Sequence, residues 1–366
     1  MPRRATRMPR ARAAVTVACV VSVLGISASS AQAAMVTVLG RDGHTHVVNN
    51  PYLSGAAANP ALPVLPAAGP ALAKPVQVLT IAPAPRVTLA TTAPVAQAAA
   101  AKAKKPRKRR KPTVSFAQAL RKLQATGALQ PAAYRSDLRT WNQALGEETH
   151  IAGWRAAQLG DVTATLDQMA NAKQVTVARL PVLMLTLANN ASYWKSGQAL
   201  ASGAAVQFQG SELVWEYYAG SGIQLQVLHT FGEGDGYYAA GVAAYPKLVT
   251  LMREMVPLAV RRGGGLAWEY YFNFDGGSPP WVSAMAQGTG LEALTDAYLA
   301  TGNSQYLTYA HQALPLLRTK PPVGVGVKTS IGTRYLQYSF TPRTDIINAF
   351  LQTLLGLYDY GQVSLD

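Results

Sequence analysis

Two tyrosines near the end of the chain stand beside arginines, a combination that can move protons next to an anionic substrate. Arg334 precedes Tyr335 directly, and Arg334 and Arg343 both lie within five residues of Tyr338. A tyrosine hydroxyl, with an unperturbed pKa near ~10, must be tuned by a neighbouring cation before it can act as a base. Either arginine could tune Tyr338 or pair with a substrate carboxylate. The alternative interpretation of Tyr338 is a buried structural tyrosine.

The sequence offers no recognisable motif for a cofactor. It contains no P-loop, no dinucleotide-binding glycine motif after a strand, no G-x-S-x-G elbow and no cluster of metal ligands. His44 and His46 lie close together, but two histidines without a third ligand are more often exposed to solvent. We therefore expect a reaction that uses neither a metal nor a cofactor.

Residues 279–317 predict a helix hairpin, and this hairpin is the element around which the rest of the chain is organised. Ser278 can cap the first helix, Gly302 supplies a left-handed stop, and Asn303 or Ser304 can cap the second helix. Small residues dominate the first helix, so its neighbours can approach closely. Gln287 is the polar residue that interrupts this run.

Two blocks of sequence resemble a known protein family. The first, at 279–288, follows the pattern P-x-W-x-S-A-M-A-Q-G. The second, at 335–342, reads YLQYSFTP and is followed by Asn348 and by G-L-Y-D at 356–359. Two blocks in this order closely resemble the C-terminal catalytic region of the D-glucuronyl C5-epimerases. The resemblance is tight over about 80 residues and looser back to about residue 116.

The resemblance implies a cofactor-free isomerase that acts on glucuronate residues of an extracellular, glycosaminoglycan-like polysaccharide. Such an enzyme removes the hydrogen at C5, next to the carboxylate, and returns a proton to the opposite face. It needs one proton-transfer group for each face, and cations or hydrogen-bond donors for the anion formed. Tyr338 matches a family tyrosine proposed to transfer protons, and Tyr335 is a weaker candidate.

The remaining site candidates are expected to bind substrate or to orient the site. Gln287 and Asn348 occupy family positions, although a structural role for Gln287 is slightly favoured. Where the family usually has a glutamate before the tyrosine, this chain has Gln337, which cannot exchange a proton. Glu269 is one possible substitute for that carboxylate. The full set of substrate-binding candidates is Arg334, Arg343, Gln287, Trp281, Asn348 and Glu269.

Three functional interpretations remain open. The first is a uronate C5-epimerase. The second is a polysaccharide lyase or hydrolase on an α/α scaffold, because a lyase removes the same C5 proton and then expels the C4 substituent. The third is a non-catalytic polysaccharide-binding relative, which Gln337 makes plausible.

The fold class predicted is mainly α, an incomplete α/α toroid of antiparallel helix pairs in residues 113–366. A small antiparallel β insertion is expected at about 203–275. Within it W-E-Y-Y occurs at 215–218 and again at 268–271, which suggests two equivalent strands. Alternation places Glu216 and Tyr218 on one face, where they could contact carbohydrate, although a half-buried strand with a wet polar edge is the commoner outcome.

The family is expected to continue with further helices beyond the G-L-Y-D motif, whereas only seven residues follow it here. We therefore expect a partner copy, another polypeptide or a C-terminal extension to complete the site. A homo-oligomer is one way to supply it.

The first 33 residues read as a signal peptide, with five arginines before an apolar run and A-Q-A at 31–33. The only cysteine, Cys19, lies within that run, so no disulfide is expected after it. We expect a secreted or cell-surface bacterial protein. Residues 34–112, rich in alanine and proline, predict a disordered tether, with a short hairpin as an alternative near its start.

The net charge of +15 belongs to the tether. Residues 1–112 hold 16 of the 33 basic and one of the 18 acidic residues, so residues 113–366 have 17 of each and are neutral. Eight of the ten residues from Lys102 to Lys111 are basic, and this run could contact polyanions or a cell surface, or be a plain solvated linker. Nucleic acid is not expected as a partner, because no stacking aromatics accompany the run.

Overall fold

The computed structural model describes residues 33–54 and 114–364. These residues are mainly helical and carry small sheets whose strand pairs are antiparallel except for one. The helices are α1 (Phe116–Ala125), α2 (Pro131–His150), α3 (Trp154–Asn171), α4 (Leu180–Ser196), α5 (Val227–Ala239), α6 (Tyr245–Met255), α7 (Ala284–Thr301), α8 (Gln305–Arg318) and α9 (Ile347–Ser364). The strands are β1 (Ala33–Leu39), β2 (Thr45–Ser54), β3 (Ala205–Phe208), β4 (Trp215–Tyr218), β5 (Gly222–Leu225), β6 (Val260–Arg262), β7 (Gly265–Ala267), β8 (Gly326–Thr329) and β9 (Gly332–Tyr335).

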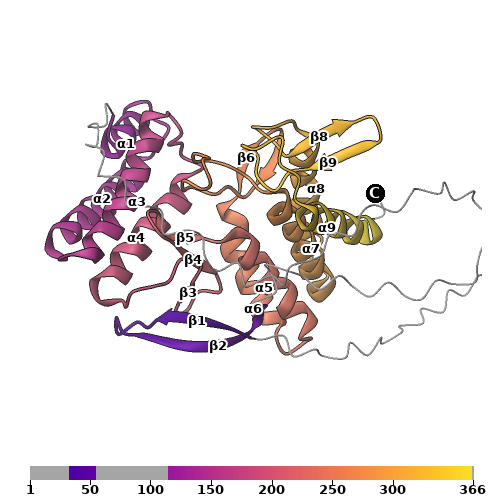
Figure 1. Cartoon of the computed structure of the whole chain (residues 1–366), viewed down its shortest axis with the longest axis horizontal. Helices are drawn as coiled ribbons and strands as arrows, with labels where there is room; N and C mark the ends of the chain where they lie inside the picture. The colour runs from indigo at the N-terminus through magenta and orange to yellow at the C-terminus, as the bar shows by residue number, and fades with distance from the viewer. Residues whose placement is uncertain (1–32, 55–113, 365–366) are drawn as a thin grey trace, which may run out of the picture.

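The helices lie roughly in chain order along the long axis of the molecule, whereas the β1–β2 hairpin, first in the chain, lies in the middle (Figure 1). Helices α1–α4 form one end, α7–α9 form the other, and the main sheet with α5 and α6 lies between them (Figure 1). One cluster of buried apolar side chains is continuous from Phe116 in α1 to Tyr360 in α9. Helix α5 contacts both β2 and α7, so it connects the central sheet to the C-terminal helices.

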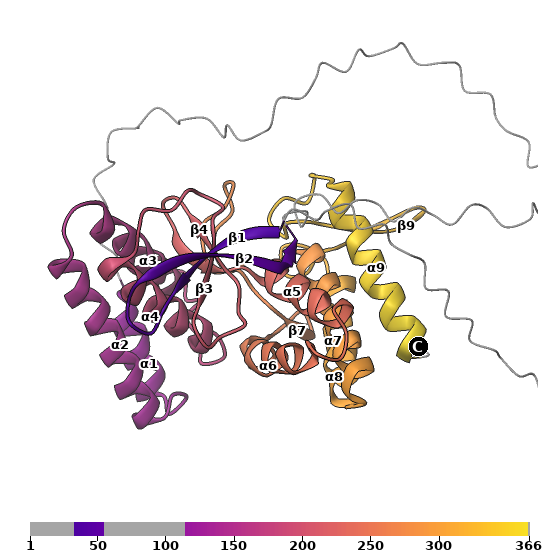
Figure 2. The same ribbon diagram turned by 90° about the horizontal axis from the view of Figure 1, so that it is seen from below.

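The main sheet has five strands in the order β2-β1-β3-β4-β5. Strand β1 pairs with β3 in parallel, with Thr37 opposite Val206, and the β1–β2 hairpin lies across the middle of the molecule (Figure 2). Asn50 Nδ2 in β2 donates a 2.8 Å hydrogen bond to the buried Glu233 carboxylate in α5. The prediction of a tether from residue 34 is therefore wrong for residues 34–54, because Thr37, Val38 and Leu39 of β1 pair with β3, far along the chain. The short hairpin given as the alternative for the start of this range is the structure that forms.

Other predictions about the first part of the chain fall on residues that the structure does not describe. These are the signal peptide at 1–32, the rest of the tether at 55–112 and the basic run from Lys102 to Lys111.

The helix hairpin predicted at 279–317 is confirmed, with its start shifted. Helix α7 begins after Ser283, whose side chain accepts from the Ala286 N–H, so Ser278 is not the cap. Gly302 ends the helix in the left-handed region with φ of 71°, and Asn303 Oδ1 accepts from the Gln305 N–H at the start of α8. The sequence signal identified both ends of the turn between the helices.

Helices α7 and α9 approach each other through glycines. A Cβ on Gly288 would lie 2.6 Å from the Cα of Thr353, and one on Gly356 would lie 2.6 Å from the carbonyl carbon of Gly288. The small residues expected to allow close approach in α7 therefore bring its backbone against that of α9. Gly361, in the same helix α9, has nothing within 4 Å of a Cβ position.

We expect Gly356→Ala to destabilise the protein by about 1–3 kcal/mol, because the added methyl group forces the α7 and α9 backbones apart. Gly361→Ala is the matched control. It should leave stability unchanged or raise it by up to ~1 kcal/mol, because alanine favours the helix. Thermal unfolding of both variants followed by circular dichroism compares them. Equal melting temperatures for the two variants would contradict this account of the contact.

The β insertion predicted at about 203–275 is correct in its first part only. Strands β3–β5 are present, but α5 and α6 fill the middle of the range, and β6 and β7 form a separate two-stranded sheet. The second W-E-Y-Y copy, at 268–271, is not a strand equivalent to β4. Only Tyr270 forms a single bridge there, with Trp281.

Candidate active site

A cleft of about 650 Å³ lies between the main sheet and the C-terminal segment that follows β9. One side is formed by the loop at 201–203 and by Glu216 and Tyr218 of β4. The other side is formed by Ser283, Gln337 and Tyr338 and by nearby aromatic side chains. No lysine or arginine is among the described residues that line it.

Aromatic rings form most of the apolar surface of the cleft. Trp281 stacks on Tyr270 with ring centroids 4.2 Å apart, and Tyr218 stacks on Phe272 at 4.3 Å. Phe274 lies between Tyr218 and Tyr338, with centroids at 5.9 Å and 5.5 Å respectively. Flat aromatic faces of this kind can receive the apolar face of a sugar ring.

Tyr338, the first catalytic candidate from the sequence, lies in this cleft. It packs edge-on against Trp281, with centroids 5.7 Å apart, and is half-buried. Burial raises the pKa of Tyr338, a hydrogen bond with Gln337 lowers it and the charge of Asp275 raises it, with a net upward shift. Tyr338 therefore holds its proton firmly, and no arginine tunes it as the sequence had suggested.

A hydrogen-bonded group faces Tyr338 from the sheet side. Gln226 Nε2 donates to the Tyr218 hydroxyl at 2.6 Å and lies 3.3 Å from Glu216 Oε2. The Tyr270 hydroxyl donates to Gln226 Oε1 at 2.7 Å. His229 Nδ1 lies 3.3 Å from the same Glu216 oxygen. Burial and the charge of Glu216 raise the pKa of Tyr218 well above its ordinary value, so Tyr218 also stays protonated.

Alternation along β4 does place Glu216 and Tyr218 on the cleft, as expected for one face of a strand. The contributions of Gln226 and Tyr270 were not predicted, because both reach the cleft through contacts distant in sequence. The one feature of the sequence that singled out Tyr270 was its place in the second W-E-Y-Y motif.

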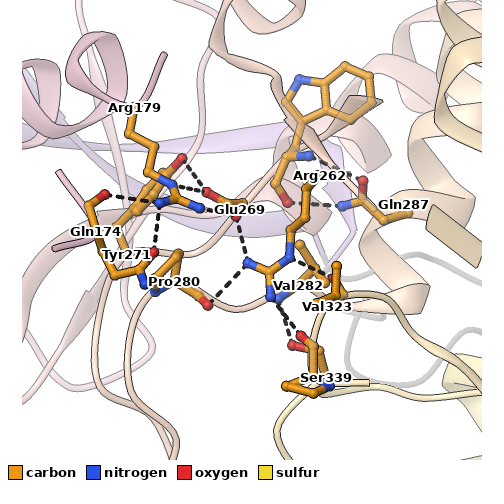
Figure 3. A network of polar contacts seen from close by, with 12 residues as sticks. Gln174, Arg179, Arg262, Glu269, Tyr271, Pro280, Val282, Gln287, Val323 and Ser339 are labelled. Atoms are coloured by element: carbon orange, nitrogen blue, oxygen red, sulfur yellow. Dashed lines mark hydrogen bonds and ion pairs between the residues drawn. The ribbon is translucent and has the colours of Figure 1, made fainter. Parts of the chain in front are cut away.

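Glu269 does not line the cleft. Its side chain is fully buried, with Arg179 at 2.7 Å and Arg262 at 2.6 Å (Figure 3). Burial alone would raise the pKa of Glu269, but the hydrogen bonds and charges of Arg179 and Arg262 outweigh it and lower the pKa. The structure therefore assigns Glu269 to an ion-pair network, and it does not replace the carboxylate missing at Gln337.

Gln287 orients the backbone, the role expected of it. It is buried in α7, accepts from the Trp268 N–H at 3.2 Å and donates to the Trp268 carbonyl at 2.9 Å (Figure 3). This pair of bonds fixes the chain one residue before Glu269.

The other sequence candidates lie away from the cleft. Arg334 is bound to Asp345, and Tyr335 stacks on Phe350; these residues line a separate groove of about 350 Å³ between the β8–β9 hairpin and the start of α9. Arg343 is exposed. Asn348 Oδ1 accepts from the N–H of the next residue, so it belongs to the first turn of α9.

A further cavity of about 720 Å³ has four carboxylates on its walls, from α5, α7 and α9. They belong to Asp235, Glu292, Asp296 and Asp359, and no basic residue is among the described residues lining the cavity. Burial, followed by the charges of Glu292 and Asp359, raises the pKa of Asp296 to about 8. Burial and the charge of Asp359 raise the pKa of Glu292 to about 7.

Asp296→Asn should therefore raise the free energy of unfolding at alkaline pH. A carboxyl whose pKa is raised by folding stabilises the protein at low pH, and this stability is lost as the pH rises from about 4 towards 8. The gain at pH 8.5 should be on the order of 1–3 kcal/mol, and it should vanish near pH 4. Urea unfolding across this range measures it. An equal change at every pH would show that the charge of Asp296 is not the cause.

No described helix is long and apolar enough to cross a membrane. Within residues 33–54 and 114–364 there is also no group of three or more side chains arranged to hold a metal ion.

Comparison with known proteins concerns the C-terminal part of the chain, which forms one side of the cleft. Residues 263–366 match the family model described as D-glucuronyl C5-epimerase C-terminus. This part of the chain belongs to the D-glucuronyl C5-epimerase C-terminal family. The D-glucuronyl C5-epimerase of Caenorhabditis elegans is 39% identical over 89 residues, which are 24% of this chain and 14% of the relative.

The residues that line the cleft fall into two groups, one inside the matched range 263–366 and one before it. Tyr338, Gln337 and Trp281 lie within the matched residues, whereas Glu216 and Tyr218 precede them. One side of the cleft therefore comes from the family region, and the other comes from a sheet outside it.

Proposed function

We propose that this protein is a C5-epimerase that acts on glucuronate residues of an extracellular polysaccharide. The observation that carries the proposal is the position of Tyr338, within the family-matched region and on the wall of an aromatic cleft. The reaction requires C5 to lose its hydrogen and to regain one on the opposite face.

The cleft can stabilise the anion that forms without a cation. Because their pKa values are raised, the hydroxyls of Tyr218 and Tyr338 remain protonated and can act as hydrogen-bond donors. Gln337 and Ser283 add further polar groups at the same wall. Donors fixed in a partly dry site stabilise developing negative charge better than water does.

The localisation and architecture belong to the same proposal. The arginine-rich apolar start and the A-Q-A sequence at 31–33 support export, and the basic run at 102–111 would hold the enzyme near an anionic polymer or surface. The pairing of α7 with α8 is one helix pair of the partial α/α toroid that we propose. The proposal includes a second copy of this chain as a partner.

The test is deuterium incorporation. The purified protein is incubated in deuterated water with a panel of glucuronate-containing polysaccharides, and the C5 position is followed by NMR. The expected result is deuterium at C5, with no unsaturated uronate and no new reducing end. An increase in ultraviolet absorbance would instead support a lyase, and substrate binding without exchange would support a non-catalytic relative.

A further inference from the structure

We infer that Glu216 is the second proton-transfer group of the cleft and works opposite Tyr338. This assignment rests on the proposed function, and it answers the question raised by Gln337, which stands before Tyr338 and cannot exchange a proton. Glu216 is the one carboxylate among the described residues that line the cleft.

The two groups come from different sides of the cleft. Glu216 belongs to β4, as does Tyr218, whose ring contacts Phe274. Tyr338, from the segment after β9, contacts the same Phe274 ring. Glu216 and Tyr338 line the same cleft from different elements, β4 and the segment after β9, so the inference places a bound sugar between them, with one group at each face of C5. Removal and return of a proton on opposite faces needs this placement.

Among the described residues, Glu216 accepts a hydrogen bond from Gln226 Nε2 and has no arginine partner of the kind that holds Glu269. Gln226 Nε2 and His229 Nδ1 each lie 3.3 Å from Oε2, and the side chain keeps 11% of its surface exposed. Glu269, by contrast, has no exposed side-chain surface and two arginine partners. Of these two carboxylates from the repeated motif, Glu216 is the one that substrate can reach.

The step balances in protons and electrons. The Glu216 carboxylate takes the C5 proton as the C5–H bond breaks, and the electron pair passes into the substrate carboxylate. Tyr338 then gives its hydroxyl proton to C5 on the opposite face, leaving a tyrosinate. Exchange with water removes the proton from Glu216 and restores the one on Tyr338. In the reverse direction the tyrosinate takes the proton and protonated Glu216 returns it.

Two substrates separate this role from a structural one. The probes are 4-linked tetrasaccharides that carry one D-glucuronate or one L-iduronate residue, and the readout is the rate of deuterium entry at C5 from each. In Glu216→Gln, exchange should fall by about 10²–10⁴-fold from both epimers, because Tyr338 stays protonated and cannot remove the C5 proton alone. In Tyr338→Phe, exchange without inversion should persist from the epimer whose proton Glu216 removes, whereas inversion and exchange from the other epimer should be lost.

The controls and contrary outcomes are distinct. Glu147→Gln removes a partly exposed carboxylate that pairs with Lys195, outside the cleft, and should leave both rates unchanged. If Glu216→Gln exchanges both epimers at the wild-type rate, or loses both equally together with its thermal stability, the assignment of Glu216 is overturned while the proposed function stands. If the wild-type protein exchanges neither epimer, the proposed function fails, and this inference fails with it.

Discussion

Tyr338→Phe is expected to abolish inversion at C5 of a glucuronate substrate and to leave the fold intact. The change removes one hydroxyl and keeps the ring that packs on Trp281 and Phe274. Loss of a positioned acid or base costs about 10²–10⁴-fold in rate. Conversion of glucuronate to its C5 epimer, followed by NMR, measures this loss, and circular dichroism checks the fold.

Tyr335→Phe is the matched control for this experiment. Tyr335 lies three residues before Tyr338 but stacks on Phe350 in the separate groove. Its hydroxyl should therefore be dispensable, and the variant should convert substrate at nearly the wild-type rate. Equal losses in the two variants would show that the cleft is not the site of reaction, and full activity in Tyr338→Phe would remove this residue from the mechanism.

Glu269→Ala should lower the free energy of unfolding by about 3–5 kcal/mol, the usual cost of removing one partner from a buried ion pair. The substitution leaves Arg179 and Arg262 facing each other without the carboxylate that both bind, and their side chains are only 14% and 12% exposed. It also breaks a link between residues 90 positions apart in the chain, Arg179 and Glu269. Urea unfolding gives the free energy.

Glu147→Ala provides the comparison. Its partner Lys195 lies at 2.8 Å, but the two side chains are 31% and 53% exposed, so the variant should lose no more than about 1 kcal/mol. If Glu269→Ala were as stable as Glu147→Ala while losing substrate binding, Glu269 would be a binding residue after all.

The sequence predicted best what is decided locally. Ser115 and Gln118, three residues apart, cap each other's backbone at the start of α1, a pairing set by adjacent sequence alone. Gly302 ends α7 as expected, because glycine adopts the left-handed conformation at little steric cost. The strand alternation that placed Glu216 on the cleft is likewise a property of consecutive residues.

What the sequence could not provide depends on partners distant in the chain. The two W-E-Y-Y copies are identical, yet one pairs with β3 and β5 while the other meets Arg179 and Arg262, so Glu216 and Glu269 have different roles. Arg334 is close to Tyr338 in sequence, but β9 directs it to Asp345 in another groove. Proximity in sequence predicted a tuning cation that the fold does not place there.

The docked β1–β2 hairpin makes the central sheet an assembly of two separate pieces of chain. Its covalent link to α1 runs through residues 55–113, whereas its hold on the sheet comes from the β1–β3 pairing and the bond from Asn50 to Glu233. A single cut within 55–113 would leave these contacts intact but turn an intramolecular association into a bimolecular one. The effective concentration that the covalent connection provides would be lost. The hairpin would then dissociate on dilution, and a peptide spanning residues 33–54 added in trans would restore the five-stranded sheet by fragment complementation.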